Sequence, residues 1–235
     1  MPIASVAYLS AANLARMIRN KEVSAAEVMQ ATLARAEKAQ PILNCFITIC
    51  ADEALRDAAE ADARQARGEP LGPLHGVPLH VKDLVNTAGV RTTFGSLIHE
   101  HNVPAADQVA VARLKTAGAI LFAKTTTPEF GHMCWTEAPL FGRTRNAWDE
   151  TRTSGGSSGG ASAACAAGIG PLAVATDAGG STRIPAAANG LVGLKQSIGM
   201  IPHDTAPDAF SNISYITPTA RTVMDTALML EAMAG

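Results

Sequence analysis

Two short turns of glycine and serine carry residues whose types and spacing suit catalysis in this 235-residue chain. Gly155-Gly156-Ser157 and Gly179-Gly180-Ser181 each place a hydroxyl directly after paired glycines. Glycine adopts positive φ and lets backbone N–H groups approach a ligand closely, so each turn offers several donors beside a hydroxyl. A flexible Gly/Ser linker is the alternative. Residues 161–167 and 171–176, however, predict a small-residue helix and an apolar strand between the turns, which a linker would lack.

Ser181 is the stronger candidate for a nucleophile. The apolar strand leads into Asp177-Ala-Gly-Gly-Ser181, and Arg183-Ile-Pro185 begins a helix with proline near its first turn. We expect an oxyanion hole at that helix N-terminus, made by the N–H groups of Ala178, Gly179, Gly180 and Ser181. Residues 155–159 also match a G-x-S-x-G nucleophile elbow, but the polar segment before them is not the strand that an elbow requires.

A serine nucleophile needs a base, and no histidine lies near Ser181 in an obvious pattern. Lys82 is the candidate, because it falls in the mostly apolar segment VPLHVKD, residues 77–83. Burial disfavours the ammonium form and lowers a lysine pKa from its usual ~10.4, which makes the amine a usable base near neutral pH. From these residues alone, the simpler interpretation is a structural lysine at a strand end that reaches solvent or pairs with Asp83.

Composition and charge limit the classes of function. Hydrophobic residues make up 47% of the chain and charged residues 17%, as in soluble globular proteins. The net charge of −2 gives no electrostatic reason to expect nucleic acid or a membrane as a direct partner. We expect no secretory signal and no membrane-spanning segment. The four cysteines lack C-x-x-C spacing, so we expect free thiols, no metal site and a cytoplasmic location.

The order of predicted elements indicates an α/β fold, with helices covering a sheet. The periodicity and capping residues predict helices over residues 10–18, 24–39, 51–67, 107–116, 161–167, 184–188 and 219–235. The apolar, β-branched segments predict strands over residues 42–50, 79–85, 119–123, 171–176 and 191–194. A turn-rich segment beginning at Pro70 divides an N-terminal helical segment, residues 1–70, from a core over residues 71–235.

Three motifs resemble the signature of the amidase signature family, and they occur in the family's order: LHGVPLHVKD, TSGGSSGGASAACAAG and ATDAGGSTRIPA. The resemblance extends from about Leu9 to Gly235. It implies a mixed β-sheet covered by helices on both faces, and a Ser–cis-Ser–Lys triad. The two serines stand 24 residues apart, from 157 to 181, as the family pattern requires.

Carried over to this sequence, the resemblance implies that Ser181 is the nucleophile, Ser157 the cis-serine and Lys82 the base. Three further residues would support the nucleophile turn, namely Ser158, Asp177 and Arg183. The implied reaction is hydrolysis of a small-molecule amide through a serine acyl-enzyme, with no cofactor. Three positions depart from the family pattern. Thr182 stands where an apolar residue is more usual, Thr217 replaces the usual glycine before proline, and Ser214 replaces an aspartate that is common in some members.

A second class of function is that of the tRNA-dependent amidotransferase, one of whose subunits is similar to this chain and hands ammonia to a partner protein. The segment TTPEF, residues 126–130, is closer to the free-standing hydrolases. In either case, proteins of the family run considerably further. We therefore expect this chain to be the front half of a longer enzyme, with an incomplete sheet. Such a half-chain would be catalytically silent alone, and would form a homo-oligomer or associate with a complementing C-terminal half.

Overall fold

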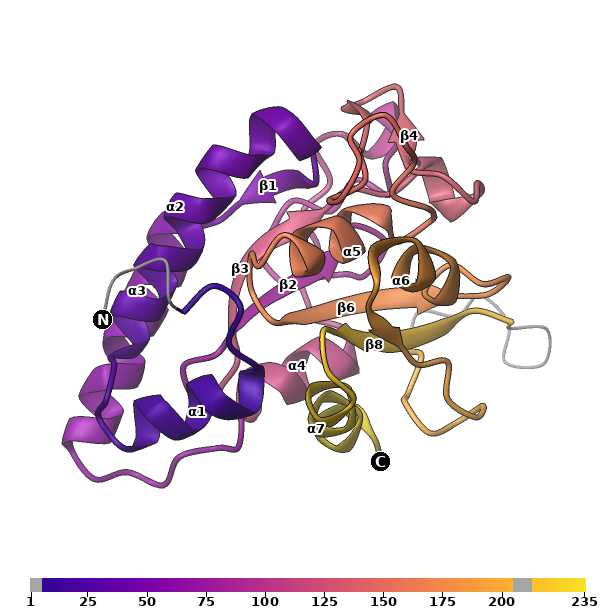
Figure 1. The fold of residues 1–235 in the computed structure, drawn as a ribbon. Helices are drawn as coiled ribbons and strands as arrows, with labels where there is room; N and C mark the ends of the chain where they lie inside the picture. Colours follow the sequence, from indigo (N-terminus) through magenta and orange to yellow (C-terminus); the bar gives the residue numbers. More distant parts are fainter. Residues whose placement is uncertain (1–5, 205–212) are drawn as a thin grey trace.

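The computed structural model of the chain describes residues 6–204 and 213–235. Its centre is a six-stranded sheet in the order β1-β3-β2-β6-β8-β7 (Figure 1). The strands of this sheet are β1 (Phe46–Ile49), β2 (Pro78–Lys82), β3 (Ile120–Thr125), β6 (Leu172–Asp177), β7 (Val192–Gly193) and β8 (Tyr215–Ala220). The three central strands β3, β2 and β6 are parallel, whereas β1, β8 and β7 pair antiparallel with their neighbours. The sheet is therefore mixed, as predicted.

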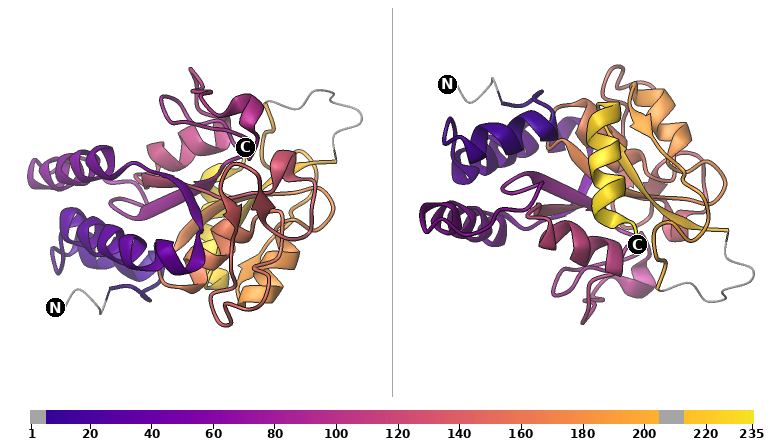
Figure 2. Two further views of the ribbon diagram at one scale, coloured as in Figure 1. Left: turned by 90° about the horizontal axis from the view of Figure 1, so that it is seen from above. Right: turned by 90° about the horizontal axis from the view of Figure 1, so that it is seen from below.

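Helices cover both faces of this sheet. The seven α-helices of the described residues are α1 (Ala11–Arg19), α2 (Ala25–Leu43), α3 (Ala51–Ala66), α4 (Val109–Thr116), α5 (Gly159–Ala166), α6 (Arg183–Asn189) and α7 (Val223–Met233). Helices α5 and α6 lie on one face, and α4 and α7 lie on the other (Figures 1 and 2). The long helices α2 and α3 pack against each other at the end of the sheet that carries β1. These layers confirm the predicted α/β architecture.

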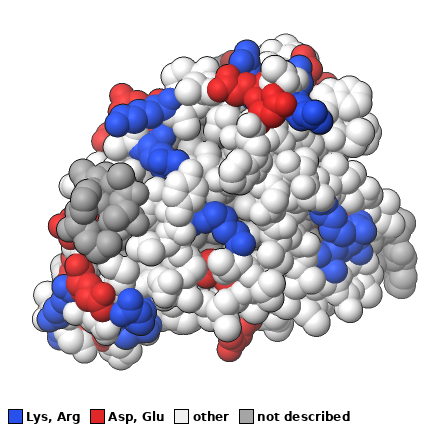
Figure 3. Space-filling view, viewed as in Figure 1, with Lys and Arg blue, Asp and Glu red and all other residues white. Residues whose placement is uncertain are grey.

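The remaining short elements lie in the connections. Two 3₁₀ helices (Leu97–His99 and Glu129–Gly131) precede a small hairpin of β4 (Glu137–Ala138) and β5 (Gly142–Arg143). Within the described residues, no helix is long and apolar enough to cross a membrane. On the face drawn in Figure 3, acidic and basic side chains lie mainly toward the periphery, and neither sign forms one continuous patch.

In helix α2 the capping residues predicted the start of the helix correctly, but the proline did not mark its end. Ser24 and Glu27 form the predicted capping box, with the Glu27 N–H donating to Ser24 Oγ at 3.0 Å. The helix does not stop before Pro41 but continues to Leu43. Pro41 is exposed and only two residues from the helix end, so the carbonyl that its missing N–H leaves free can reach water. The strand predicted over residues 42–50 therefore shortens to Phe46–Ile49.

The C-terminal part differs more from prediction. Residues 215–220 form β8, a strand that was not predicted, and Thr219 lies inside it instead of capping the last helix. Thr222 is the cap, and its side chain accepts from the Asp225 N–H. Pro218 stands opposite Val174 in the ladder, and a proline inside an apolar segment argues against a strand. The predicted cap Asp107 is likewise wrong, because its carboxylate accepts from Ala88 and Lys115 while Gln108 stands at the N-cap.

Candidate active site

Lys82 is the last residue of β2, a strand whose five residues are all buried. Its side chain has no solvent exposure. The side-chain nitrogen Nζ lies 2.6 Å from Ser157 Oγ, 2.9 Å from Ser158 Oγ and 2.9 Å from Thr176 Oγ1. The lysine side chain therefore does not reach solvent, and its nitrogen is not paired with a carboxylate. Hydroxyl groups surround the nitrogen instead.

The surroundings of Lys82 favour its neutral amine. Burial lowers the pKa of Lys82 well below its usual value, and the negative charge of Asp177 offsets part of that effect. Asp83, the partner that the simpler interpretation offered, accepts instead from the N–H and hydroxyl of Thr93, at 2.9 and 2.5 Å. The predicted strand over residues 79–85 also ends at Lys82, because Val85 N–H closes a turn onto the Lys82 carbonyl.

Ser157 and Ser158 lie on the loop before α5. The Gly156–Ser157 peptide bond is cis. The Thr136 hydroxyl donates to the Gly155 carbonyl at 2.9 Å and accepts from the Gly159 N–H at 3.1 Å, so one side chain spans the loop. All eight residues of α5 are buried. Their small size brings the helix N-terminus close to the sheet, and this places the loop over Lys82.

Glycine is required where another segment crosses this loop. A Cβ at Gly156 would lie 2.6 Å from the Trp135 nitrogen and 2.7 Å from the Met133 carbonyl oxygen. A Cβ at Gly131 would lie 2.7 Å from Leu84 Cδ1 and 3.3 Å from Ser157 Oγ. The segment from Gly131 to Trp135 therefore forms a wall directly against Ser157.

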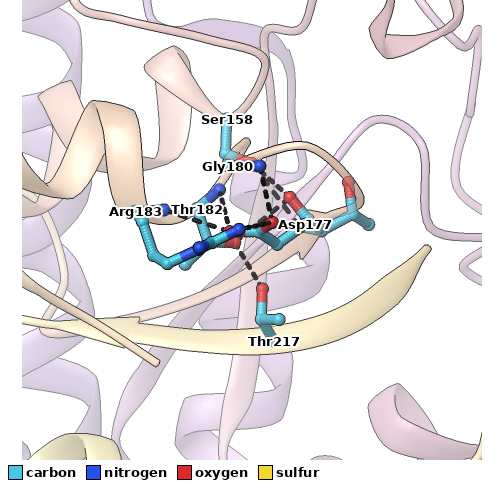
Figure 4. A network of polar contacts seen from close by, with 7 residues as sticks. Ser158, Asp177, Gly180, Thr182, Arg183 and Thr217 are labelled. Carbon is cyan, nitrogen blue, oxygen red and sulfur yellow. Dashed lines mark hydrogen bonds and ion pairs between the residues drawn. The ribbon is translucent and has the colours of Figure 1, made fainter. Parts of the chain in front are cut away.

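Asp177 organises the turn that carries Ser181 (Figure 4). Its buried carboxylate accepts from the N–H groups of Gly180 at 2.8 Å and Thr182 at 3.2 Å, and from the Arg183 guanidinium at 2.9 Å through both oxygens. Burial alone raises the pKa of Asp177, but the hydrogen bonds from Arg183 and from the backbone together lower it below its usual value. Asp177 is thus an ionised anchor at the end of β6.

Of the four N–H groups expected to form an oxyanion hole, one already donates to Asp177 and three do not. The Gly180 N–H is directed to Asp177 and is not available to a ligand in this arrangement. In the part of the chain that the structure describes, no group accepts from the N–H groups of Ala178, Gly179 and Ser181. Ala178 and Gly179 are exposed. Three of the four donors therefore have no acceptor among the described residues.

The two turns meet across the ends of adjacent parallel strands. The Ser158 N–H donates to the Ser181 carbonyl at 3.1 Å. Strands β2 and β6 are parallel neighbours. Lys82 and Asp177 are their last residues and therefore lie at the same edge of the sheet. The structure thus brings together Lys82, Ser157, Ser158 and Ser181, which lie far apart in the sequence.

Sequence reasoning missed two buried polar residues around Lys82. Thr176 contacts the amine directly, and its position just before the Asp-Ala-Gly-Gly-Ser turn was the available clue. Lys124 on β3 is also fully buried, and its Nζ donates to the Val85 carbonyl and to the hydroxyls of Thr87 and Thr92. Burial lowers the pKa of Lys124 to about 8, partly opposed by the nearby Asp83. Lys124 holds the loop that follows Lys82.

No cluster of metal ligands stands out in the described ranges 6–204 and 213–235. No group of three or more His, Cys, Asp or Glu side chains is placed there to hold a metal ion. The ring of His99, in the loop after β2, packs edge-on against Phe94 and Phe130.

A mixed α/β sheet that presents a buried lysine to serine hydroxyls is the arrangement that the three motifs predicted. The family model described as Amidase matches residues 27–235, so the chain belongs to the amidase family whose signature those motifs resemble. It is 44% identical over 228 residues to an acylamidase of Rhodococcus erythropolis, a match that covers 97% of this chain and 48% of that protein. It is equally 44% identical over 228 residues to the A-type subunit of the glutamyl-tRNA(Gln) amidotransferase of Carboxydothermus hydrogenoformans, covering 97% and 47%.

Solved structures agree on the fold. A bacterial aryl acylamidase of the amidase signature enzymes superposes with a TM-score of 0.94 at 34% identity, covering 98% of this chain and 48% of that one. The peptide amidase of Stenotrophomonas maltophilia superposes with a TM-score of 0.89, also at 34% identity, covering 96% and 48%. This chain therefore spans about half the length of the relatives that it matches.

Proposed function

We propose that this chain carries the catalytic triad of an amide hydrolase, with Ser181 as nucleophile, Ser157 as the bridging cis-serine and Lys82 as base. The observation that carries the proposal is the position of Lys82. It is fully buried, and its amine lies 2.6 Å from Ser157 Oγ. A lysine that stays neutral beside a serine hydroxyl is a base for that hydroxyl.

The first half of the reaction forms the acyl-enzyme. Ser181 Oγ attacks the amide carbonyl carbon and passes its proton to Ser157 Oγ, while Ser157 passes its own proton to Lys82 Nζ. The N–H groups of Ala178, Gly179 and Ser181 stabilise the oxyanion. As the tetrahedral intermediate collapses, the C–N bond breaks. The leaving amine then takes a proton from Ser157, which recovers one from Lys82.

The second half releases the acyl group. Water attacks the acyl-enzyme ester, its proton moves through Ser157 to Lys82, and the Ser181 oxygen leaves as a hydroxyl after protonation along the same path. No cofactor takes part in these steps. Ser158, Asp177 and Arg183 act by holding the two turns in place.

A second candidate is the A-type subunit of an amidotransferase, favoured by the 44% identity to that subunit of the glutamyl-tRNA(Gln) amidotransferase. It would use the same acyl-enzyme chemistry and deliver the released ammonia to a partner. Co-purification with a second, tRNA-binding protein, together with release of ammonia from glutamine, would support this candidate. Turnover of simple aryl amides without such a partner would favour the hydrolase.

Labelling with a fluorophosphonate probe tests the proposed nucleophile. The probe should attach to Ser181, located by mass spectrometry, and Ser181→Ala should abolish labelling while the thermal unfolding transition remains. Ser162→Ala is the matched control, because Ser162 is buried and its hydroxyl has no partner among the described residues. Labelling that persists in Ser181→Ala and is located elsewhere would refute the proposal.

A further inference from the structure

The hydroxyl groups around Lys82 can be assigned as donors or acceptors by counting hydrogens. A neutral lysine amine has two N–H donors and one lone pair. Three hydroxyl oxygens lie within hydrogen-bond distance of Nζ, those of Ser157, Ser158 and Thr176. One of these groups must therefore donate to the amine while the other two accept from it.

Ser158 is one of the acceptors. Its hydroxyl lies 3.2 Å from the Thr176 carbonyl oxygen, which accepts its hydrogen. Since that hydrogen is used, the 2.9 Å contact with Lys82 requires an N–H of the amine to point at Ser158 Oγ.

Ser157 is the donor. Its side chain is almost fully buried at 1% exposure, and Lys82 is the one described group in hydrogen-bond contact with its hydroxyl. A buried hydroxyl hydrogen without an acceptor is costly, so the Ser157 hydrogen points at the lone pair of Lys82. This is also the shortest of the three contacts, at 2.6 Å.

The remaining N–H of Lys82 then points at Thr176 Oγ1. Thr176 keeps 7% exposure as a residue, against 1% for Ser157, so a hydroxyl hydrogen that does not point at the amine is less costly at Thr176 than at Ser157. Threonine is branched at Cβ and has few χ1 rotamers, which holds the oxygen in one place at the end of β6.

We propose that Thr176 is a positioning residue: together with Ser158 it accepts the two N–H groups of neutral Lys82 and so aims the lone pair of the amine at Ser157. This inference rests on the proposed function of Lys82 as the base. When the proton of Ser157 moves to Nζ, the new N–H points back at Ser157, and the ammonium has an acceptor for each hydrogen. The transfer therefore needs no rotation of the lysine side chain.

Removing the Thr176 hydroxyl should change both the rate and the pH dependence of Ser181 acylation. In Thr176→Val the amine can turn its lone pair away from Ser157, and we expect the plateau rate of fluorophosphonate labelling to fall about tenfold. The ammonium form loses a stronger hydrogen bond than the neutral amine does. The acidic limb of the pH–rate profile should therefore move to lower pH, by about half a unit or more.

Three variants serve as controls. Thr176→Ser keeps the hydroxyl and should retain the wild-type rate and limb. Thr219→Val removes a fully buried hydroxyl that has no partner among the described residues, and it should leave both unchanged. Should Thr176→Val fail to give a thermal unfolding transition, Thr176→Cys replaces it. The thiol is a weaker acceptor, so the limb should move in the same direction.

The titratable and charged groups around the amine are the same in all these variants, namely His80 and Asp83 on either side of Lys82, Lys124 on β3, Cys165 on α5, and Asp177 and Arg183 beyond Thr176. A shift of the limb therefore reports the lost hydroxyl. An unchanged rate and limb in Thr176→Val would overturn the inference. So would a faster rate or a limb at higher pH, which would mean that Thr176 donates to the lone pair.

Failure of the proposed function looks different. If the wild-type chain is not labelled, or is labelled at a residue other than Ser181, the proposed triad is wrong and the inference falls with it. If wild-type labelling at Ser181 is intact and Thr176→Ser is as slow as Thr176→Val, the inference alone is wrong.

Discussion

The hydroxyl groups of Thr182 and Thr217 lie 2.5 Å apart and join the turn that carries Ser181 to the neighbouring strand β8 (Figure 4). These are two of the three positions at which the sequence departs from the family pattern. Thr182 also donates to the Thr176 carbonyl at 3.1 Å, so Thr217 is the donor of the pair. The two departures thus form one buried interaction beside Ser181.

This direction of donation predicts unequal effects of the two valine substitutions. Thr217→Val removes one hydrogen bond and should lower the free energy of unfolding by about 1 kcal/mol. Thr182→Val leaves the buried Thr217 hydroxyl without an acceptor and should cost about 2 kcal/mol. The double variant should cost clearly less than the sum, as measured by urea denaturation. Additive costs would show that the pair is not coupled.

Asp177 should matter more than its partner Arg183. The carboxylate is buried and holds the turn through three backbone N–H groups, whereas the Arg183 side chain is 54% exposed. We expect Asp177→Asn to lower the free energy of unfolding by about 2 kcal/mol and to slow probe labelling of Ser181 strongly. Arg183→Met should have a clearly smaller effect on both measurements, because its guanidinium is largely in solvent. The reverse order, measured by denaturation and labelling together, would contradict this account of the turn.

Lys82 should contribute to the change of the unfolding free energy with pH. Its pKa in the folded state lies well below the ~10.4 of the unfolded chain, so at alkaline pH below that value the unfolded chain binds the extra proton. The stability present above ~10.4 is therefore lost as the pH falls. At alkaline pH just below ~10.4, Lys82→Met should therefore make the unfolding free energy rise less steeply with pH than it does in wild type.

Lys124→Met is the matched comparison for this slope. The pKa of Lys124 in the folded state is about 8, so Lys124 also makes the unfolding free energy rise with pH below ~10.4. Below about pH 8 this contribution ends, because Lys124 is then protonated in both states. The quantity to compare is the slope of unfolding free energy against pH in the three proteins, measured under the same conditions. A slope in Lys82→Met equal to that of wild type would mean that Lys82 is not held neutral.

His80 makes the fold sensitive to acid. The ring is fully buried between Phe46 and Phe122, and burial lowers its pKa from 6.5 to about 3, with a small contribution from Arg221. Stability is thus complete above about 6.5 and is lost by about 1.4 kcal/mol per unit as the pH falls toward about 3. Between pH 7 and 5, His80→Phe should lose about 2 kcal/mol less than wild type in urea unfolding. Equal losses in the two proteins would exclude His80 as the source.

The association state is a further prediction. The chain spans about half of its relatives, and large apolar side chains are exposed beside β7 and β8 and at the start of α7, namely Ile198, Met200, Ile213, Val223 and Met224. We expect the isolated chain to be poorly soluble or oligomeric and to turn over aryl amides slowly, with activity returning when a polypeptide matching the later half is added. A soluble monomer in light scattering that hydrolyses an aryl amide at ordinary enzyme rates would contradict this.

A pocket open to water would leave Lys82 hydrated and protonated, and the chain would then lack a base. The lysine nevertheless has no solvent exposure within this chain. Helix α5 and its preceding loop, which lie within the second motif, cover it. Covalent labelling of Ser181 and turnover of an amide should therefore be tested separately.

Much of the site could be predicted because its residues fall in short, unusual motifs. The glycine pairs before Ser157 and Ser181 can be recognised in the sequence without a fold, whereas Lys82 was assigned as the base only through the resemblance to the family. The groups that these residues contact cannot be recognised from the sequence in this way. The contact of Lys82 with Thr176 depends on the register of β2 against β6, and the engagement of the Gly180 N–H by Asp177 depends on the path of the turn. Strand β8 was missed because Pro218 suits a loop in isolation, whereas the ladder tolerates it opposite Val174.

The three hydroxyls around Lys82 come from positions 75, 76 and 94 residues further along the chain. Contacts of such long separation close large loops, whose entropy must be lost before the contacts can stabilise the chain. The site therefore cannot form within a single helix or hairpin. It is complete only after strands β2 and β6 have paired. During refolding, the appearance of a reactive Ser181 would report the assembly of the central sheet itself.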